Sequence, residues 1–133
     1  MIPPFNDFGY LPAGLHLAAL DEIDERFGKG TELRRVQMES LRWLVDLAQR
    51  SGVLRLVVNG SFVTQAPEPN DVDCVLLIET GFPRDQAAEQ EILAGLPFLQ
   101  IELAEREVFD DFVNVLFASD RRMILKGMIE VPL

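Results

Sequence analysis

The sequence contains a single cysteine, Cys74, among its 133 residues, which excludes an internal disulfide framework. It also lacks any apolar run near the roughly 18 residues that a membrane-spanning helix needs. Residues 1–5 have neither a basic region nor an apolar core, so we expect no signal peptide. These absences predict a cytoplasmic protein that does not cross a membrane and folds around its own core.

Basic residues are scarce relative to acidic ones. Lysine and arginine number 12 against 22 aspartates and glutamates, which gives a formal net charge of −10. Such a field repels phosphate backbones and anionic lipid surfaces, so generic DNA binding and membrane docking are not expected. Most of the acids are typical of a solvated surface, whereas a cluster of carboxylates around a divalent cation would have a function.

The apolar pattern predicts one domain over residues 1–133, with an ordered N-terminal arm over residues 1–18 that includes a structural His16. Helices are expected over residues 21–27, 31–50 and 85–93, and a helix or helix-like turn over 108–117. Strands are expected over residues 53–58, 71–78, 98–104 and 128–131. This order favours an α+β fold in which helices pack on a mixed central sheet. Three arginines of the second helix are interpreted as a solvated face: Arg34, Arg35 and Arg42.

A short motif joins the first two of the three longer strands. Gly60-Ser61 follows the first strand, and Asp71 and Asp73 stand at the start of the second. Residues two apart on a strand point to the same face, so the two carboxylates would repel each other. A divalent cation between them removes this repulsion, and hard carboxylate oxygens suit Mg²⁺ or Mn²⁺. Glycine lets backbone N–H groups approach a phosphate, and serine adds a hydroxyl donor.

A third acid, Glu102, alternates with apolar neighbours in the third strand and is the candidate to complete a metal site with Asp71 and Asp73. Three carboxylates on adjacent strands can hold two metal ions about 3.5–4 Å apart. Arg121 and Lys126 are candidates to hold phosphate oxygens.

Each of these assignments has a structural alternative. Asp71 and Asp73 also suit a capped strand start, and Glu102 suits the solvent-facing side of a strand. Arg121 and Lys126 also suit a surface turn. The acidic run over residues 105–111 is interpreted as a solvated surface.

The motif resembles the nucleotidyltransferase superfamily of the DNA polymerase beta type. Gly60, Ser61, Asp71 and Asp73 match its Gly-Ser and Asp-x-Asp signature residue by residue, and Glu102 takes the place of the later acid. The resemblance covers residues 53–104 and is closest to small, minimal members and to short bacterial proteins of uncharacterised function. It implies a nucleotidyltransferase-like two-layer fold, with the three acids as catalytic metal ligands and Gly60, Ser61, Arg121 and Lys126 as the nucleotide-binding residues.

The implied activity is the Mg²⁺-dependent transfer of a nucleoside monophosphate from an NTP, such as ATP, to a hydroxyl on a protein, an RNA or a small molecule. The resemblance also implies a toxin–antitoxin or phage-defence setting, with a homo-oligomer or a toxin or antitoxin partner. The family often has an arginine shortly after Gly-Ser, where this sequence has residues 62–64, Phe-Val-Thr. This departure motivates an alternative, a catalytically inactive relative that binds a partner protein. A hydrolase that uses the same metals on a phosphate ester is a third hypothesis.

Overall fold

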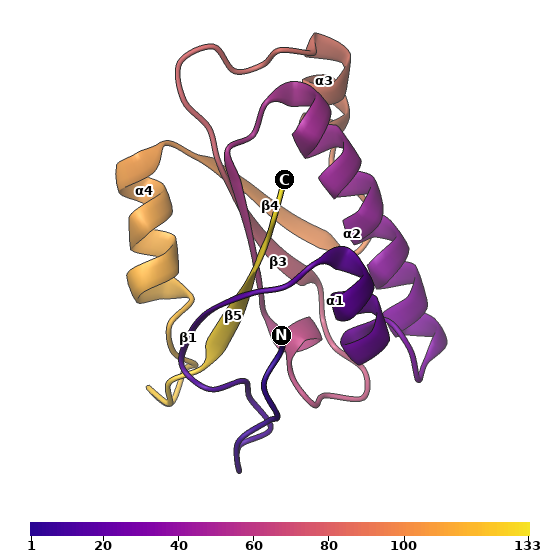
Figure 1. Cartoon of the computed structure of the whole chain (residues 1–133), viewed down its shortest axis with the longest axis vertical. Coiled ribbons are helices and arrows are strands. Elements are labelled where there is room, and N and C mark those ends of the chain that lie inside the picture. The colour runs from indigo at the N-terminus through magenta and orange to yellow at the C-terminus, as the bar shows by residue number, and fades with distance from the viewer.

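Five strands form one mixed sheet in the computed structural model, which describes residues 1–133 (Figure 1). The strands are β1 (Gly14–Leu17), β2 (Arg55–Asn59), β3 (Val72–Leu77), β4 (Leu99–Ala104) and β5 (Gly127–Val131). They lie side by side in the order β1-β5-β2-β3-β4. The outer pairs β1–β5 and β3–β4 are parallel, and the inner pairs β5–β2 and β2–β3 are antiparallel. The expected α+β fold with a mixed central sheet is confirmed.

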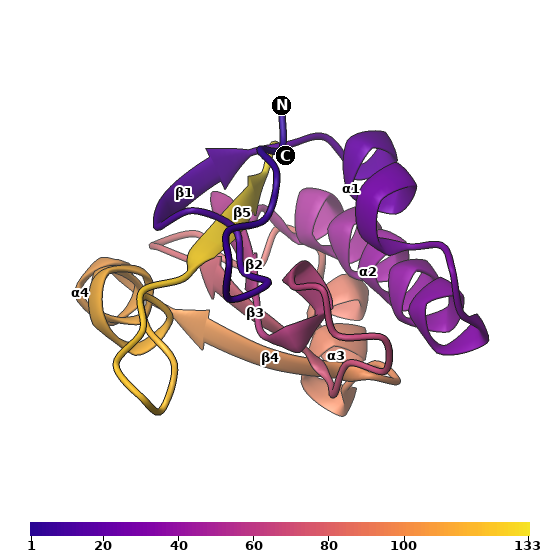
Figure 2. The ribbon, with the colours of Figure 1, turned by 90° about the horizontal axis from the view of Figure 1, so that it is seen from below.

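Helices cover the sheet unequally (Figure 2). Three of them lie together on one face: α1 (Leu20–Phe27), α2 (Glu32–Ser51) and α3 (Gln86–Ala94). The short α4 (Arg106–Asp111), continued by the π-helix η2 (Phe112–Leu116), lies on the other side. Thr31 caps the N-terminus of α2, because its Oγ1 atom accepts a hydrogen bond from the Arg34 backbone N–H at 3.1 Å. None of the helices combines the length and the apolar character that crossing a bilayer requires.

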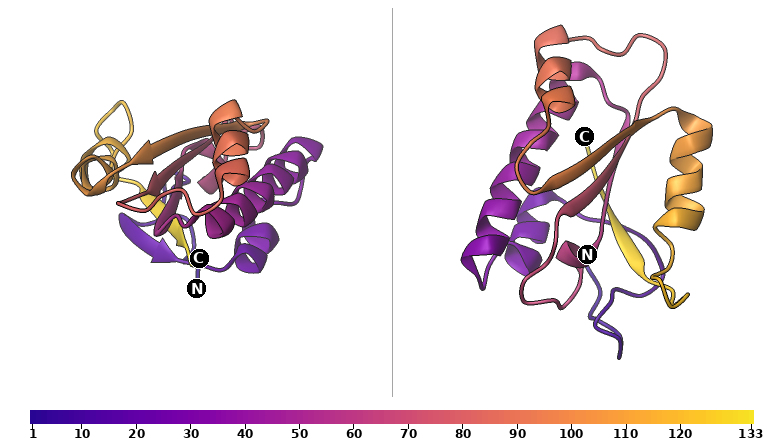
Figure 3. Two further views of the ribbon diagram at one scale, coloured as in Figure 1. Left: turned by 90° about the horizontal axis from the view of Figure 1, so that it is seen from above. Right: turned by 180° about the vertical axis from the view of Figure 1, so that it is seen from behind.

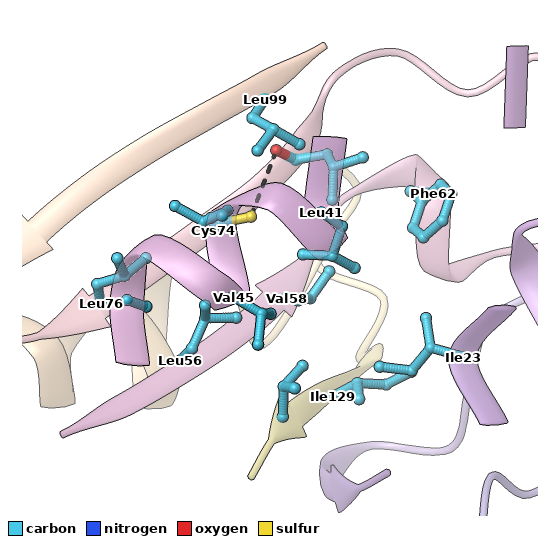
Figure 4. Close-up of a cluster of buried hydrophobic side chains, with 14 of the residues drawn as sticks. Ile23, Leu41, Val45, Leu56, Val58, Phe62, Cys74, Leu76, Leu99 and Ile129 are labelled. Carbon is cyan, nitrogen blue, oxygen red and sulfur yellow. Dashed lines mark hydrogen bonds between the residues drawn. The ribbon is translucent and has the colours of Figure 1, made fainter. Parts of the chain in front are cut away.

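Strand β3 divides its side chains between two apolar layers. Val72, Cys74 and Leu76 point toward α2 and belong to the main core, which Figure 4 shows around Cys74. Val75 and Leu77 point the other way, into a smaller cluster that includes Phe109 of α4. Burial raises the pKa of the Cys74 thiol, so this cysteine acts as a small apolar residue of the core. The alternation leaves Asp73 on the face of the sheet that α4 only partly covers.

Two segments differ from the elements that the sequence predicts. The N-terminal arm contains β1, a four-residue strand that pairs in parallel with the C-terminal strand β5. The helix or helix-like turn expected over residues 108–117 is present, although it begins earlier, at Arg106, and its second half is the π-helix η2. Pairing between the two ends of the chain decides the first difference, and local sequence carries little signal for it.

Candidate functional site

A polar cleft opens where the N-terminal end of β3 meets the end of β2. Its volume is about 520 Å³, and no hydrophobic residue lines it. Eight residues form the walls: Gly60, Ser61, Asn70, Asp71, Asp73, Gln100, Arg121 and Lys126. The structure thus brings together six of the seven residues that the sequence singles out, and only Glu102 is missing from the cleft.

Gly60 and Asp73 are in van der Waals contact across the β2–β3 pair. A Cβ atom at residue 60 would lie 2.7 Å from Asp73 Oδ2, and the backbone φ of Gly60 is +90°. Both facts require glycine, because an L side chain rarely adopts this φ and no space exists for one. The glycine of the Gly-Ser motif therefore makes room for the aspartate of the next strand.

Side chains of α2 hold the loop from Ser61 to Asn70 in place through hydrogen bonds. The Arg34 guanidinium donates to the carbonyl oxygens of Phe27 (3.0 Å), Phe62 (2.8 Å), Thr64 (2.9 Å) and Ala66 (2.5 Å). Arg34 is buried, which corrects its interpretation as part of a solvated face. Its N–H groups take the place of water as hydrogen-bond donors to carbonyl groups of an irregular loop. Without them these carbonyl groups would be buried without partners.

Gln37, one turn further along α2, completes this support. Its Nε2 atom donates to the carbonyl oxygens of Pro69 (3.2 Å) and Asn70 (2.6 Å). The backbone N–H of Asn70 in turn donates to Ser61 Oγ at 2.8 Å. This bond closes the loop and leaves the hydroxyl hydrogen of Ser61 free to donate into the cleft.

Asp73 and Lys126 are half-buried at the base of the cleft, where burial and neighbouring charges shift their pKa values. Burial raises the pKa of Asp73, the charge of Asp71 raises it further, and Lys126 opposes the rise. Burial lowers the pKa of Lys126, and Asp73 and Asp120 oppose that change. Asp71 is exposed and accepts a hydrogen bond from Gln100 Nε2 at 2.9 Å. The cleft therefore holds two carboxylates, and the charge of Lys126 opposes the effect of Asp71 on the pKa of Asp73.

Arg121 and Lys126 lie on a loop that Asp120 anchors. Asp120 Oδ1 accepts hydrogen bonds from the backbone N–H groups of Arg122 (2.8 Å) and Ile124 (3.0 Å). Its Oδ2 atom accepts one from the Tyr10 hydroxyl at 2.7 Å. These bonds lower the pKa of Asp120 to about 2. The loop that carries Arg121 and Lys126 is a turn at the surface and also forms one wall of the cleft. Its position is therefore compatible with both interpretations of these two residues.

Glu102 lies outside the cleft because of the β3–β4 register. Strand β4 lies beside β3, as expected, and runs parallel to it, but Asp73 pairs with Gln100 and Glu102 pairs with Val75. Two residues along a strand displace Glu102 from Asp73 by about 7 Å. Glu102 instead lines a separate hollow of about 230 Å³, together with Asp73, Cys74, Gln100, Phe112 and Phe117. Figure 3 shows β4 at the edge of the sheet with α4 beside its end.

The chain holds no group of three or more histidine, cysteine, aspartate or glutamate side chains arranged to bind a metal ion. Asp71 and Asp73 are the two carboxylates that the cleft offers. The sequence reasoning missed Gln100 and Asn70, although the alternation that selected Glu102 places Gln100 on the same face of β4. His16 has a structural role, because its Nε2 atom donates to the Pro12 carbonyl at 2.7 Å.

A protein family of unknown function, DUF6932, matches residues 3–132. The chain belongs to this family. The match covers nearly the whole sequence, so the cleft and both strands at its base lie within the family domain. Comparison with curated proteins and with solved structures finds no match.

Proposed function

We propose that this chain is a Mg²⁺-dependent nucleotidyltransferase, which moves a nucleoside monophosphate from an NTP to a hydroxyl group of a second substrate. One observation supports the proposal above all others. The paired aspartates, Gly60-Ser61 and two cationic side chains line the same 520 Å³ cleft, although Asp71 and Lys126 are far apart in the sequence. A triphosphate needs cationic and hydroxyl donors, and a bound divalent ion needs carboxylates beside them.

The residues of the cleft fit a magnesium ion or a manganese ion in the same place. Protein sites hold Mg²⁺ through one or two carboxylates together with substrate phosphates and water, so Asp71 and Asp73 suffice as protein ligands. Burial, and to a smaller extent the charge of Asp71, raises the pKa of Asp73, and a cation between the two carboxylates would favour its charged form. When bound, the ion supplies positive charge to the phosphate oxygens and lowers the pKa of the attacking hydroxyl.

The side chains of the cleft would bind and orient the triphosphate. Lys126 and Arg121 pair with phosphate oxygens, and the free hydroxyl hydrogen of Ser61 donates to another. The acceptor oxygen forms a bond to the α-phosphorus while the bond from that phosphorus to the bridging oxygen breaks. Pyrophosphate leaves with the electron pair of that bond, and the proton of the acceptor hydroxyl passes to solvent.

The test is calorimetric titration with Mg²⁺ and each NTP, followed by transfer of labelled nucleotide to cell-lysate acceptors. The wild-type chain should bind a Mg²⁺–NTP and label an acceptor. Asp71→Asn and Asp73→Asn should lose both activities, whereas Asp7→Asn, at an exposed aspartate outside the cleft, should keep them. Full transfer activity in Asp73→Asn would disprove the proposal.

A second candidate function is a nucleotidyltransferase-like module that has lost catalysis and acts by binding a partner protein, as a toxin or antitoxin does. The position of Glu102, two residues from the pairing partner of Asp73, favours it, since this leaves the cleft with two acids instead of three. Failure of every NTP to bind in the titration would favour this function over the enzyme.

A further inference from the structure

The hollow that contains Glu102 lies next to the polar cleft and shares two of its residues. Asp73 and Gln100 line both, so the hollow and the cleft are direct neighbours. We call the hollow formed by Gln100, Glu102, Phe112 and Phe117 beside Asp73 and Cys74 the aromatic hollow. Its volume of about 230 Å³ admits one planar ring system.

The π-helix η2 builds the aromatic wall of this hollow. The Phe117 backbone N–H donates to the Phe112 carbonyl at 2.8 Å, a bond that spans five residues. The wide turn brings the side chains of Phe112 and Phe117 to the same side, with ring centroids 5.5 Å apart and ring planes at 64°. In a regular α-helix, residues five apart point in clearly different directions. Single π turns of this kind occur often at functional sites.

The polar groups opposite the two rings are hydrogen-bond acceptors. Glu102 and Asp73 present carboxylate oxygens, and Gln100 uses its Nε2 atom on Asp71, which leaves its Oε1 atom free to accept. A ligand that matches this hollow is therefore flat on one side and carries N–H donors at its edge. Nucleobases with an exocyclic amino group have both properties, whereas a second phosphate group would be repelled.

We propose that the aromatic hollow binds the nucleobase of the triphosphate held in the polar cleft, and that Glu102 selects bases with an exocyclic amino group. This inference rests on the proposed function, since the phosphates fix the nucleotide at the cleft. It assigns Glu102 to base selection instead of metal binding. Phe112 and Phe117 supply the stacking surface, and Gln100 joins the two parts of the site.

The experiment compares three ligands on the full-length chain with Mg²⁺: inorganic tripolyphosphate, ATP and purine riboside triphosphate. Purine riboside triphosphate differs from ATP only by a hydrogen atom in place of the exocyclic amino group. ATP should bind about tenfold tighter than purine riboside triphosphate to the wild-type chain, and Glu102→Ala should reduce this ratio to near one. Glu107→Ala, at an exposed glutamate of α4, should keep the wild-type ratio.

Stacking is tested separately by Phe112→Leu and Phe117→Leu. Each should lower the affinity for ATP by about tenfold while the affinity for tripolyphosphate stays unchanged, which also shows that the cleft is folded. Phe8→Leu, at an exposed phenylalanine of the N-terminal arm, is the matched control. The ratio of the affinities of the wild-type chain for ATP and for purine riboside triphosphate needs no variant, and it tests the proposal even if a variant fails to fold.

Two outcomes separate this inference from the proposed function. Binding of tripolyphosphate with equal affinities for ATP and purine riboside triphosphate, or with no effect of Phe112→Leu, overturns the base site and leaves the proposed function standing. If neither tripolyphosphate nor any nucleotide binds, the proposed function fails and the base site fails with it.

Discussion

Asp73 Oδ2 occupies the space that a side chain at Gly60 would fill, since a Cβ atom there would lie 2.7 Å from it. The two residues are thus linked sterically, across the β2–β3 pair, as well as through the motif they share. The position of the half-buried Asp73 carboxylate depends on the absence of a side chain at residue 60.

Gly60→Ala should therefore disturb the site more than backbone strain alone explains. Gly95 has nearly the same φ, +87° against +90° at Gly60, but nothing lies within 4 Å of its Cβ position. Gly95→Ala should lower the free energy of unfolding by about 1–3 kcal/mol through strain. Gly60→Ala should cost about 1–3 kcal/mol more through the clash, and it alone should abolish binding of Mg²⁺–ATP. Urea denaturation and calorimetry measure both, and equal losses in the two variants would contradict the steric link.

Arg34 is expected to be the most costly arginine to replace. Arg34→Met leaves four carbonyl oxygens of the chain without their donor, so the free energy of unfolding should fall by about 3–5 kcal/mol. Arg35→Met, at an exposed position one residue away, should change it by less than about 0.5 kcal/mol. Urea denaturation of both variants tests this, and similar values for the two would show that the Arg34 contacts contribute little.

The Asp120 anchor predicts a pH dependence of stability. Folding lowers the pKa of Asp120 from its ordinary value of 3.8 to about 2. A lowered pKa stabilises the folded state above the ordinary value, and this contribution disappears as the pH falls through the interval between 3.8 and 2. The difference in urea midpoint between the wild-type chain and Asp120→Asn should therefore be constant near neutral pH and shrink over that interval.

Tyr10→Phe removes the donor that contributes most to the lowered pKa of Asp120. The pKa of Asp120 in this variant should lie closer to its ordinary value, so acidification should remove a smaller stabilising contribution, and its loss should be complete at a higher pH than in the wild-type chain. Titration of the Asp120 carboxyl by NMR measures the pKa directly. An unchanged value would show that the backbone N–H groups of Arg122 and Ile124 alone hold the carboxylate.

Lys126 is expected to contribute affinity for phosphate groups. Lys126→Met should weaken binding of Mg²⁺–tripolyphosphate by about tenfold to a hundredfold, because a charge-assisted hydrogen bond is lost. Lys29→Met, at an exposed lysine outside the cleft, should have no effect. Equal affinities in the wild-type chain and Lys126→Met would place the triphosphate elsewhere.

Local patterns in the sequence were sufficient for most of the elements and for the base of the site. Alternation along β3 assigned Val72 and Cys74 to the core and Asp73 to the opposite face, because side-chain direction in a strand follows from parity alone. Thr31 marked the start of α2 for a similar reason, since a cap acts within three residues.

Other features depend on long-range pairing and were decided only by the tertiary structure. The register of β4 against β3 placed Gln100 beside Asp73 and moved Glu102 into the aromatic hollow, although both residues have the same parity. Arg34 is buried because it donates hydrogen bonds to carbonyl groups of a loop about 30 residues away. The periodicity of a helix carries no information about such a distant contact.

The sequence by itself determined the α+β composition, the apolar faces of the strands and the Gly-Ser and Asp-x-Asp motif, because propensity and periodicity act over a few residues. Only the tertiary structure decided which side chains share the cleft. Tyr10 and Asp120 are 110 residues apart, and contact between them follows from packing of the whole chain, which local preferences do not encode.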